Sequence, residues 1–389
     1  MKIRSLIASV ALLAVASPLA AQSLFNAAGL GIPVEALDGR ARALGNLGIG
    51  LDGGSFMPTD PGALGRLGIS TGVMVAQPSW TDYSLDGGEA GQFQGNRFPL
   101  LGLAYPVLSG MMSVQVGSFL DQEYEARTSG TIDVGTGPIA TTDVFRQDGS
   151  ISNLNVGFSR MVTSSVSVGL MVGRYAGSLD RTLTRTYGDE GDAGNVDPYV
   201  ETGVWSWVGH SFTAGATADV GSTLRVAASV QVPTDLDAQA SEETRGDDRT
   251  FALPIQYRVG ATAALTPSLK VTGSMALADW SSTGDDLAGG SFAHNANGVG
   301  VGLELSRARL WGKDAPLRFG FRQTGLPFSF DDDRVDERVF SAGFGLALNT
   351  TNSIVLAGVD LAVERGRRSG GGLTESFWRA TLSLLASGF

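Results

Sequence analysis

The sequence predicts a transmembrane antiparallel β-barrel. Apolar residues alternate with polar or small residues along many segments, as in residues 224–232 and 255–265. Side chains of a strand point to opposite faces with a period of two, so each segment has one apolar face and one polar face. No apolar run reaches the roughly 20 residues that a spanning helix needs. Since lipid cannot satisfy the hydrogen bonds of an open sheet edge, an apolar exterior requires a closed barrel.

Residues 1–21 have the form of a secretory signal peptide. Lys2 and Arg4 give a positive start, residues 6–16 are mostly apolar, and Leu19-Ala20-Ala21 forms a plausible cleavage site. The apolar stretch is too short to span a membrane as a helix. We therefore expect a cleaved leader, with an uncleaved anchor as the alternative.

Two regions are predicted after the leader. Residues 22–68 do not alternate, and we expect a compact N-terminal hatch or plug segment with one short helix near 34–44. Residues 69–389 are predicted to form the transmembrane β-barrel in about 14 strands. The expected strands are 69–83, 98–108, 111–125, 143–161, 165–177, 200–218, 224–233, 254–265, 269–281, 296–307, 316–328, 335–348, 353–365 and 373–389.

The links between these strands alternate in length. Short links such as 109–110, 220–222 and 266–268 separate longer polar links. The expected long links are 84–97, 126–142, 178–199, 234–253, 282–295 and 366–372. Bacterial barrels have short periplasmic turns and long external loops, and a soluble β-sandwich has no need of this asymmetry. Residues 308–315 are an exception, because they form a long link where a short one is expected.

Composition excludes several functions. The chain has 389 residues, no cysteine and a formal net charge of −11. An acidic chain is a poor nucleic-acid binder, so we expect no nucleic-acid partner. Without cysteine there is no disulfide, no thiol catalysis and no lipoprotein anchor.

Several motifs resemble those of FadL-type outer-membrane transporters. These are Ala41-Arg42-Ala43-Leu44-Gly45, Asp60-Pro61-Gly62-Ala63-Leu64, and the stretch from Leu253 to Gly260 that leads to Trp280. The family has Asn where this chain has Asp60, and Ala where it has Gly62. The segments 317–320, 326–328 and 360–366 also look like this superfamily, including PorV-type barrels. The resemblance implies a fourteen-stranded barrel closed by an N-terminal hatch, and passive uptake of hydrophobic compounds such as long-chain fatty acids.

The alternation also predicts which charged side chains face the lumen. An arginine on the lipid face near the midplane costs about 2–4 kcal/mol, so charges are expected on the inner face. The predicted lumen-lining residues are Arg258, Lys270, Glu304, Arg318, Arg322, Asp360, Glu364 and Arg379. These charges either orient a ligand head group, for example a carboxylate on Arg318 or Arg322, or pair with one another across strands to neutralise the lumen.

The tripeptide Asp60-Pro61-Gly62 has two interpretations. It is part of the hatch if the family resemblance holds, and an ordinary loop turn by the chemistry of proline and glycine.

Six aromatic residues are expected near strand ends, where they form an interfacial girdle, namely Trp80, Tyr83, Tyr105, Trp280, Phe328 and Trp378. Of the two histidines, His210 lies in a strand without a recognisable triad, and His294 is expected in a solvated loop.

The leading functional hypothesis is passive uptake of a hydrophobic small molecule across the outer membrane of a Gram-negative-type bacterium. We expect no enzymatic activity, no cofactor and no metal site. The expected partners are outer-membrane lipids, the hydrophobic ligand and the barrel-assembly machinery. The alternatives are a PorV-type barrel that docks secreted proteins and a general porin-like structural barrel.

Overall fold

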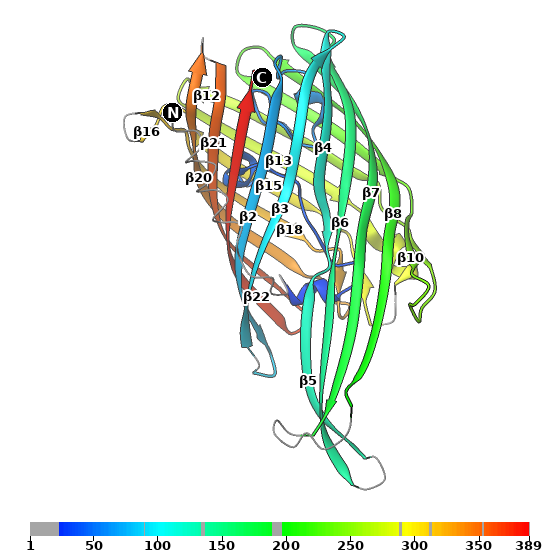
Figure 1. Ribbon diagram of the computed structural model, residues 1–389. Helices are drawn as coiled ribbons and strands as arrows, with labels where there is room; N and C mark the ends of the chain where they lie inside the picture. The colour runs from blue at the N-terminus through cyan, green and yellow to red at the C-terminus, as the bar shows by residue number, and fades with distance from the viewer. Residues whose placement is uncertain are drawn as a thin grey trace, which may run out of the picture.

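The computed structural model describes residues 23–88, 90–133, 137–188, 197–287, 290–310, 313–351 and 354–388. The predicted signal peptide, residues 1–21, lies outside the described residues. Within them the main sheet has 18 strands. Fourteen of these form a closed antiparallel barrel (Figure 1). The other four are β1 (Ile32–Pro33), which lies inside the ring, and β5 (Tyr124–Asp133), β10 (Leu236–Ala240) and β11 (Arg249–Phe251), which extend from the wall. The ring closes where Thr71 pairs with Ser387 and Leu85 pairs with Leu373. The predicted fold class is confirmed.

Each of the fourteen wall strands pairs with two neighbours in the ring. The wall strands are β2 (Thr71–Leu85), β3 (Ala90–Val107), β4 (Gly110–Asp121), β6 (Pro138–Met161), β7 (Val166–Tyr187), β8 (Tyr199–Val220), β9 (Leu224–Pro233), β12 (Gln256–Thr266), β13 (Leu269–Ala278), β15 (Gly298–Leu305), β18 (Leu317–Gly325), β20 (Asp336–Thr351), β21 (Ile354–Gly370) and β22 (Leu373–Ser387).

Strand β15 shows how the alternation sorts side chains between lipid and lumen. Gly298, Gly300, Gly302 and Glu304 are buried inside, whereas Val299, Val301, Leu303 and Leu305 are exposed outside. The same sorting along the other strands produces an outer belt of exposed valine, leucine and phenylalanine side chains. On the outer face, the guanidinium of Arg365 lies 5.3 Å from the ring centroid of Trp378.

Three of the predicted long links, 84–97, 126–142 and 366–372, are largely strand among the described residues, and 178–199 is strand as far as Tyr187, so that part of the sequence prediction is wrong. β6, β7 and β8 have 24, 22 and 22 residues, about twice the 9–11 that cross a membrane. With β5 (Tyr124–Asp133) they project as a ribbon beyond the barrel (Figure 1). Both faces of this ribbon meet water, so the apolar alternation stops. The ladder hydrogen bonds continue, and they keep the strands formed.

The short turns gather at the opposite end of the barrel. Leu108 and Ser109 form the β3–β4 turn with positive φ, and Thr266–Leu269 is the β12–β13 turn. The long link noted at 308–315 contains the small hairpin β16 (Arg309–Leu310) and β17 (Lys313–Asp314). Since short turns are periplasmic in bacterial barrels, we call this the periplasmic end and the ribbon end the outer end. No helix of the described residues has the length and apolar character of a transmembrane helix.

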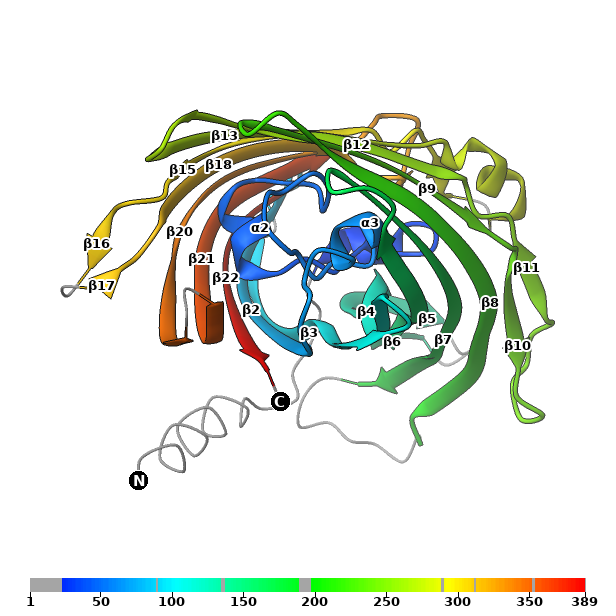
Figure 2. The ribbon, with the colours of Figure 1, turned by 90° about the horizontal axis from the view of Figure 1, so that it is seen from above.

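Residues 23–68, which we call the inner segment, lie inside the ring of strands (Figure 2). Their elements are η2 (Leu24–Ala27), β1 (Ile32–Pro33), α2 (Gly39–Ala43) and α3 (Pro61–Leu64). The helix predicted near 34–44 begins only after Asp38, whose carboxylate accepts the Ala41 N–H at 2.7 Å. Val34 is extended because its N–H donates to the Phe119 carbonyl of β4 at 2.8 Å.

Inward-facing glycines let the inner segment approach the wall backbone. A Cβ added to Gly300 would lie 2.0 Å from the Gly45 carbonyl oxygen, and one added to Gly320 would lie 2.2 Å from the Leu44 carbonyl carbon. Contacts below 3.0 Å are forbidden for a real Cβ, so any larger residue at these positions displaces the segment or the strand. The glycine-rich composition therefore reflects close packing of two backbones.

An aromatic cluster fills the outer end of the lumen. It joins Ala28 and Leu30 of the inner segment to Tyr175, Trp207 and the connections between the wall strands. These connections include β10 (Leu236–Ala240), β11 (Arg249–Phe251), η3 (Trp280–Asp286), β14 (Phe292–Ala293) and β19 (Phe328–Ser329).

Two expectations for this region are wrong. Trp280 and Phe328 are both buried and pack edge to face at 5.3 Å, so they belong to the cluster and not to the outer girdle. His294 is also buried, and its Nε2 lies 2.8 Å from the Ser329 hydroxyl. The connections between the wall strands fold back over the lumen at this end. Their burial leaves no periodic signal in the sequence, so the sequence did not predict it.

Candidate functional site

Asp60 is the N-cap of α3 and ties the inner segment together. Its Oδ1 accepts from the Ala63 N–H at 3.2 Å and from the Thr217 hydroxyl of β8 at 3.1 Å. Its Oδ2 accepts from the Gly50 N–H at 3.0 Å. Pro61 and Gly62 occupy the first turn of α3 and are buried against the wall. The tripeptide therefore starts a lumenal helix, which an isolated reading of its turn chemistry does not reveal.

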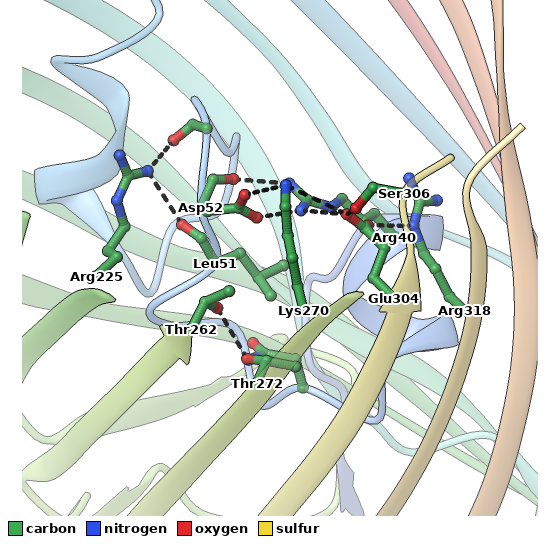
Figure 3. A network of polar contacts seen from close by, with 12 residues as sticks. Arg40, Leu51, Asp52, Arg225, Thr262, Lys270, Thr272, Glu304, Ser306 and Arg318 are labelled. Carbon is green, nitrogen blue, oxygen red and sulfur yellow. Dashed lines mark hydrogen bonds and ion pairs between the residues drawn. The ribbon is translucent and has the colours of Figure 1, made fainter. Parts of the chain in front are cut away.

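A first ion-pair network links the inner segment to the wall at the periplasmic end (Figure 3). Arg40 of α2 pairs with Asp52 and, at 3.1 Å, with Glu304 of β15. Lys270 of β13 pairs with Asp52 at 2.5 Å, and Arg318 of β18 pairs with Glu304 at 2.8 Å. Arg318 also pairs with Asp360 of β21. We call this the periplasmic network, and in it three cations alternate with three carboxylates.

A second network crosses the middle of the lumen, and we call it the central network. Glu364, which is 0 % exposed, accepts from Arg322 at 2.5 Å and lies 3.6 Å from Arg379 and 3.9 Å from Arg42. Glu337 lies 3.2 Å from Arg322 and 2.6 Å from Arg368. Glu375 lies 3.2 Å from Arg368 and accepts from the Ser23 hydroxyl at 2.7 Å. Removing one member of such a buried set leaves its partners without a counter-charge.

The residues predicted to line the lumen all lie on the inner side of the wall. Arg318, Arg322, Glu304, Asp360, Glu364 and Arg379 belong to the two networks, and Arg258 lines the cavity described below. The pairing of Arg318 and Arg322 with carboxylates matches the interpretation in which the lumenal charges neutralise one another.

Sequence reasoning missed Arg40 and Asp52 of the periplasmic network, Arg42, Glu337, Arg368 and Glu375 of the central network, and Glu35 and Arg97 beside them. Glu375 shares the inward parity of Arg379 on β22, and Glu337 shares that of Val339 and Ser341 on β20, so alternation alone could have found them. Arg97 and Arg368 fall in segments that were predicted as loops. Arg42 lies on a short lumenal helix without a periodic pattern.

A cavity of about 160 Å³ lies between the inner segment and the wall. Its polar lining includes Asn153, Asn155, Gln231, Gln256 and six arginines, namely Arg42, Arg97, Arg258, Arg322, Arg368 and Arg379. Its apolar lining includes Ile32, Val34, Phe119, Trp280 and Leu326. The aromatic cluster therefore closes the outer side of the cavity, and the central network forms part of its wall.

The structure also bears on two other kinds of chemistry, catalysis by His210 and metal binding. His210 is exposed on the outer face of β8, opposite Arg174 of β7. Ser211, its neighbour in sequence, is buried on the inner face, so the two side chains cannot act together. Within the described part of the chain, no group of three His, Cys, Asp or Glu side chains could hold a metal ion.

Comparison with known proteins adds fold-level evidence. No protein-family model matches the chain, and no curated protein matches it. A solved FadL homologue of Pseudomonas aeruginosa matches with a TM-score of 0.59 at 12 % identity, covering 92 % of this chain and 99 % of that one. The Pseudomonas putida toluene transporter TodX matches at 0.55 and 13 % identity, covering 92 % of this chain and 98 % of TodX. The chain has the FadL-type barrel fold.

A third solved structure with this fold is the CymD monoaromatic hydrocarbon channel. It matches with a TM-score of 0.55 and 14 % identity, covering 92 % of this chain and 98 % of CymD. Of the three, CymD is a channel, TodX is a transporter and the third is a FadL homologue. The FadL-type barrel described here has the apolar outer belt that an outer-membrane location requires.

Proposed function

We propose that this FadL-type barrel takes up hydrophobic small molecules passively across the outer membrane, long-chain fatty acids among them. The observation that carries the proposal is a cavity with an apolar side, set in the lumen of a barrel that the inner segment obstructs. A general pore needs an open aqueous lumen, whereas here tightly packed residues cross it. Selective uptake is the function that this geometry supports best.

In the proposed mechanism the ligand enters from the outer end, past the aromatic cluster, and rests in the cavity. It passes on when the inner segment, with Asp60, Pro61 and Gly62 at its centre, rearranges as a hatch. No covalent step and no cofactor take part. The driving force is the concentration gradient together with removal of apolar surface from water.

Uptake of labelled palmitate and labelled toluene, in cells with and without the gene, tests the proposal. We expect faster uptake of at least one compound when the barrel is present. Equal uptake of both compounds by the two strains would contradict the proposed function. Co-purification of a secreted protein would then favour the docking alternative, and an ion current through the purified barrel would favour the porin-like alternative.

An engineered disulfide tests the rearrangement separately. The chain contains no cysteine, so a new pair has no competing thiol. A Cβ added to Gly117 of β4 would lie 2.8 Å from the Ala36 Cβ, and a disulfide needs about 3.8 Å, so a small shift suffices. The double variant Ala36→Cys and Gly117→Cys is expected to lose uptake when oxidised and to regain it with reductant. Each single variant is the control, and unchanged uptake in the oxidised double variant would show that uptake does not require movement of this part of the segment.

A further inference from the structure

The charges around the cavity are not balanced. The six arginines that line it have five carboxylates among them, namely Glu35, Asp121, Glu337, Glu364 and Glu375. Buried charges in proteins are paired, because an uncompensated ion loses its hydration without replacement. The cavity wall therefore holds one cation more than its own carboxylates neutralise.

Arg258, which is half-buried, is the arginine that lacks a carboxylate of the described residues within ion-pair distance; Glu35 lines the same cavity and acts on it only from farther away. Its neighbours across the ladder are Ser229 of β9 and Ala276 of β13, and neither carries a charge. No carboxylate of the described residues lies within 4.0 Å of its guanidinium, and its buried Nε has no hydrogen-bond partner among them. By contrast, Arg322 and Arg368 each contact two carboxylates. A guanidinium of this kind presents two parallel N–H donors that match a carboxylate.

The rest of the cavity limits the size and polarity of what can sit beside Arg258. Phe119, Trp280 and Leu326 provide an apolar surface on the side of the aromatic cluster. The volume is about 160 Å³. An apolar cavity of about 150 Å³ in a protein interior accommodates benzene. The space thus suits a body of about one ring, and a long acyl chain could place only one end in it.

We infer that the cavity binds a compact hydrophobic monocarboxylate, such as a benzoate-type acid, with its carboxylate on Arg258 and its apolar body against Phe119 and Trp280. This inference rests on the proposed function and specifies its substrate class. The carboxylate supplies the missing negative charge, and the apolar body replaces water against the aromatic side chains. The geometry thereby distinguishes an acid from a neutral hydrocarbon of the same size.

Binding to the purified full-length barrel in detergent provides the first test. Trp280 is one of six tryptophans and lines the cavity, so a fluorescence change that Trp280→Phe abolishes reports occupancy, and isothermal titration gives the affinity. The probes are benzoate, benzyl alcohol as the neutral analogue, acetate as the head group alone, and palmitate as the long-chain acid. We expect benzoate to bind at least about tenfold more tightly than benzyl alcohol and acetate, as a charge-assisted hydrogen bond predicts.

Variants of Arg258 provide the second test. Arg258→Gln is expected to weaken benzoate binding by about 10- to 100-fold and to leave benzyl alcohol binding within about twofold. Arg258→Lys keeps the charge and should recover part of the affinity. Arg174→Gln, which removes an exposed arginine from the outer face of β7, is the matched control and should bind benzoate like the parent. Heat-dependent gel mobility shows that each variant has a folded barrel.

Three results would overturn the inference. These are equal affinities for benzoate and benzyl alcohol, unchanged benzoate affinity in folded Arg258→Gln, and tighter binding of palmitate than of benzoate. The outcome is separable from that of the proposed function. Uptake of neutral toluene without benzoate binding would refute only the acid site. Benzoate binding without uptake of any compound would refute only transport.

Discussion

The substitution Gly300→Ala should detach the inner segment from the wall without unfolding the barrel. The new Cβ would lie 2.0 Å from the Gly45 carbonyl oxygen and 3.1 Å from the Ser274 hydroxyl. Relief of the first contact requires a shift of more than about 1 Å, and overpacking of this kind costs about 1–3 kcal/mol. β15 is paired along its whole length with both β13 and β18, so the inner segment is the part that yields.

Two measurements check this prediction. Amide hydrogen exchange of residues 44–46 should become faster, and the purified variant should pass more ion current in planar bilayers than the parent. Gly273→Ala is the matched control, because its Cβ would meet only the Gly300 carbonyl oxygen at 4.0 Å, an ordinary contact. Parent-like exchange and current in folded Gly300→Ala would refute the reasoning. Loss of the folded barrel would show that the wall yields instead.

Three further predictions concern the charged groups of the lumen. Glu364→Gln should lower the free energy of unfolding by about 3–5 kcal/mol, because Arg322, Arg42 and Arg379 lose their shared counter-charge; urea titrations followed by gel mobility measure this. The control is Asp314→Asn, at an exposed pair with Arg309, which should change the free energy of unfolding by less than about 1 kcal/mol. Similar losses in both variants would contradict this account. Asp60→Ala should lower the free energy of unfolding by about 1–2 kcal/mol and speed amide hydrogen exchange in α3, because the N-cap and the Thr217 hydrogen bond disappear. Unchanged exchange in α3 would argue against a capping role. Burial favours the neutral form of Asp52, but Arg40 and Lys270 outweigh burial and hold the pKa of this carboxyl below its usual range. The stability that Asp52 provides is therefore present above its unfolded pKa of about 3.9 and is lost as the pH falls through the lower folded value. Proteolysis of residues 51–55 should stay slow down to about pH 4 in the parent, and it should be faster in Asp52→Asn than in the parent at pH 7. Onset of rapid proteolysis near pH 6 in the parent would contradict the ion pairing.

The sequence by itself determined the wall. Alternation such as Gly-Val-Gly-Val-Gly-Leu-Glu-Leu in β15 separates lipid-facing from lumen-facing side chains, because a strand has a strict period of two and a lipid-facing charge is costly. That single rule fixed the number of strands, the closed ring and the inward orientation of Glu304, Arg322 and Glu364. The rule of alternation does not apply beyond the edge of the membrane. Beyond that edge both faces are wet, and the parts of the ribbon at 126–142 and 178–199 were predicted as loops.

Only the tertiary structure decided what fills the lumen. Alternation shows that Arg258 and Arg322 both point inward, but the partner of each depends on which strands the ring brings together. Glu337 and Glu364 lie within ion-pair distance of Arg322, whereas no carboxylate of the described residues lies within 4.0 Å of the Arg258 guanidinium. The inner segment has no repeat, and its path follows glycines on distant strands. Which arginine is left without a counter-charge is therefore a property of the assembled barrel, because pairing depends on distance in space and a local sequence pattern carries no information about it.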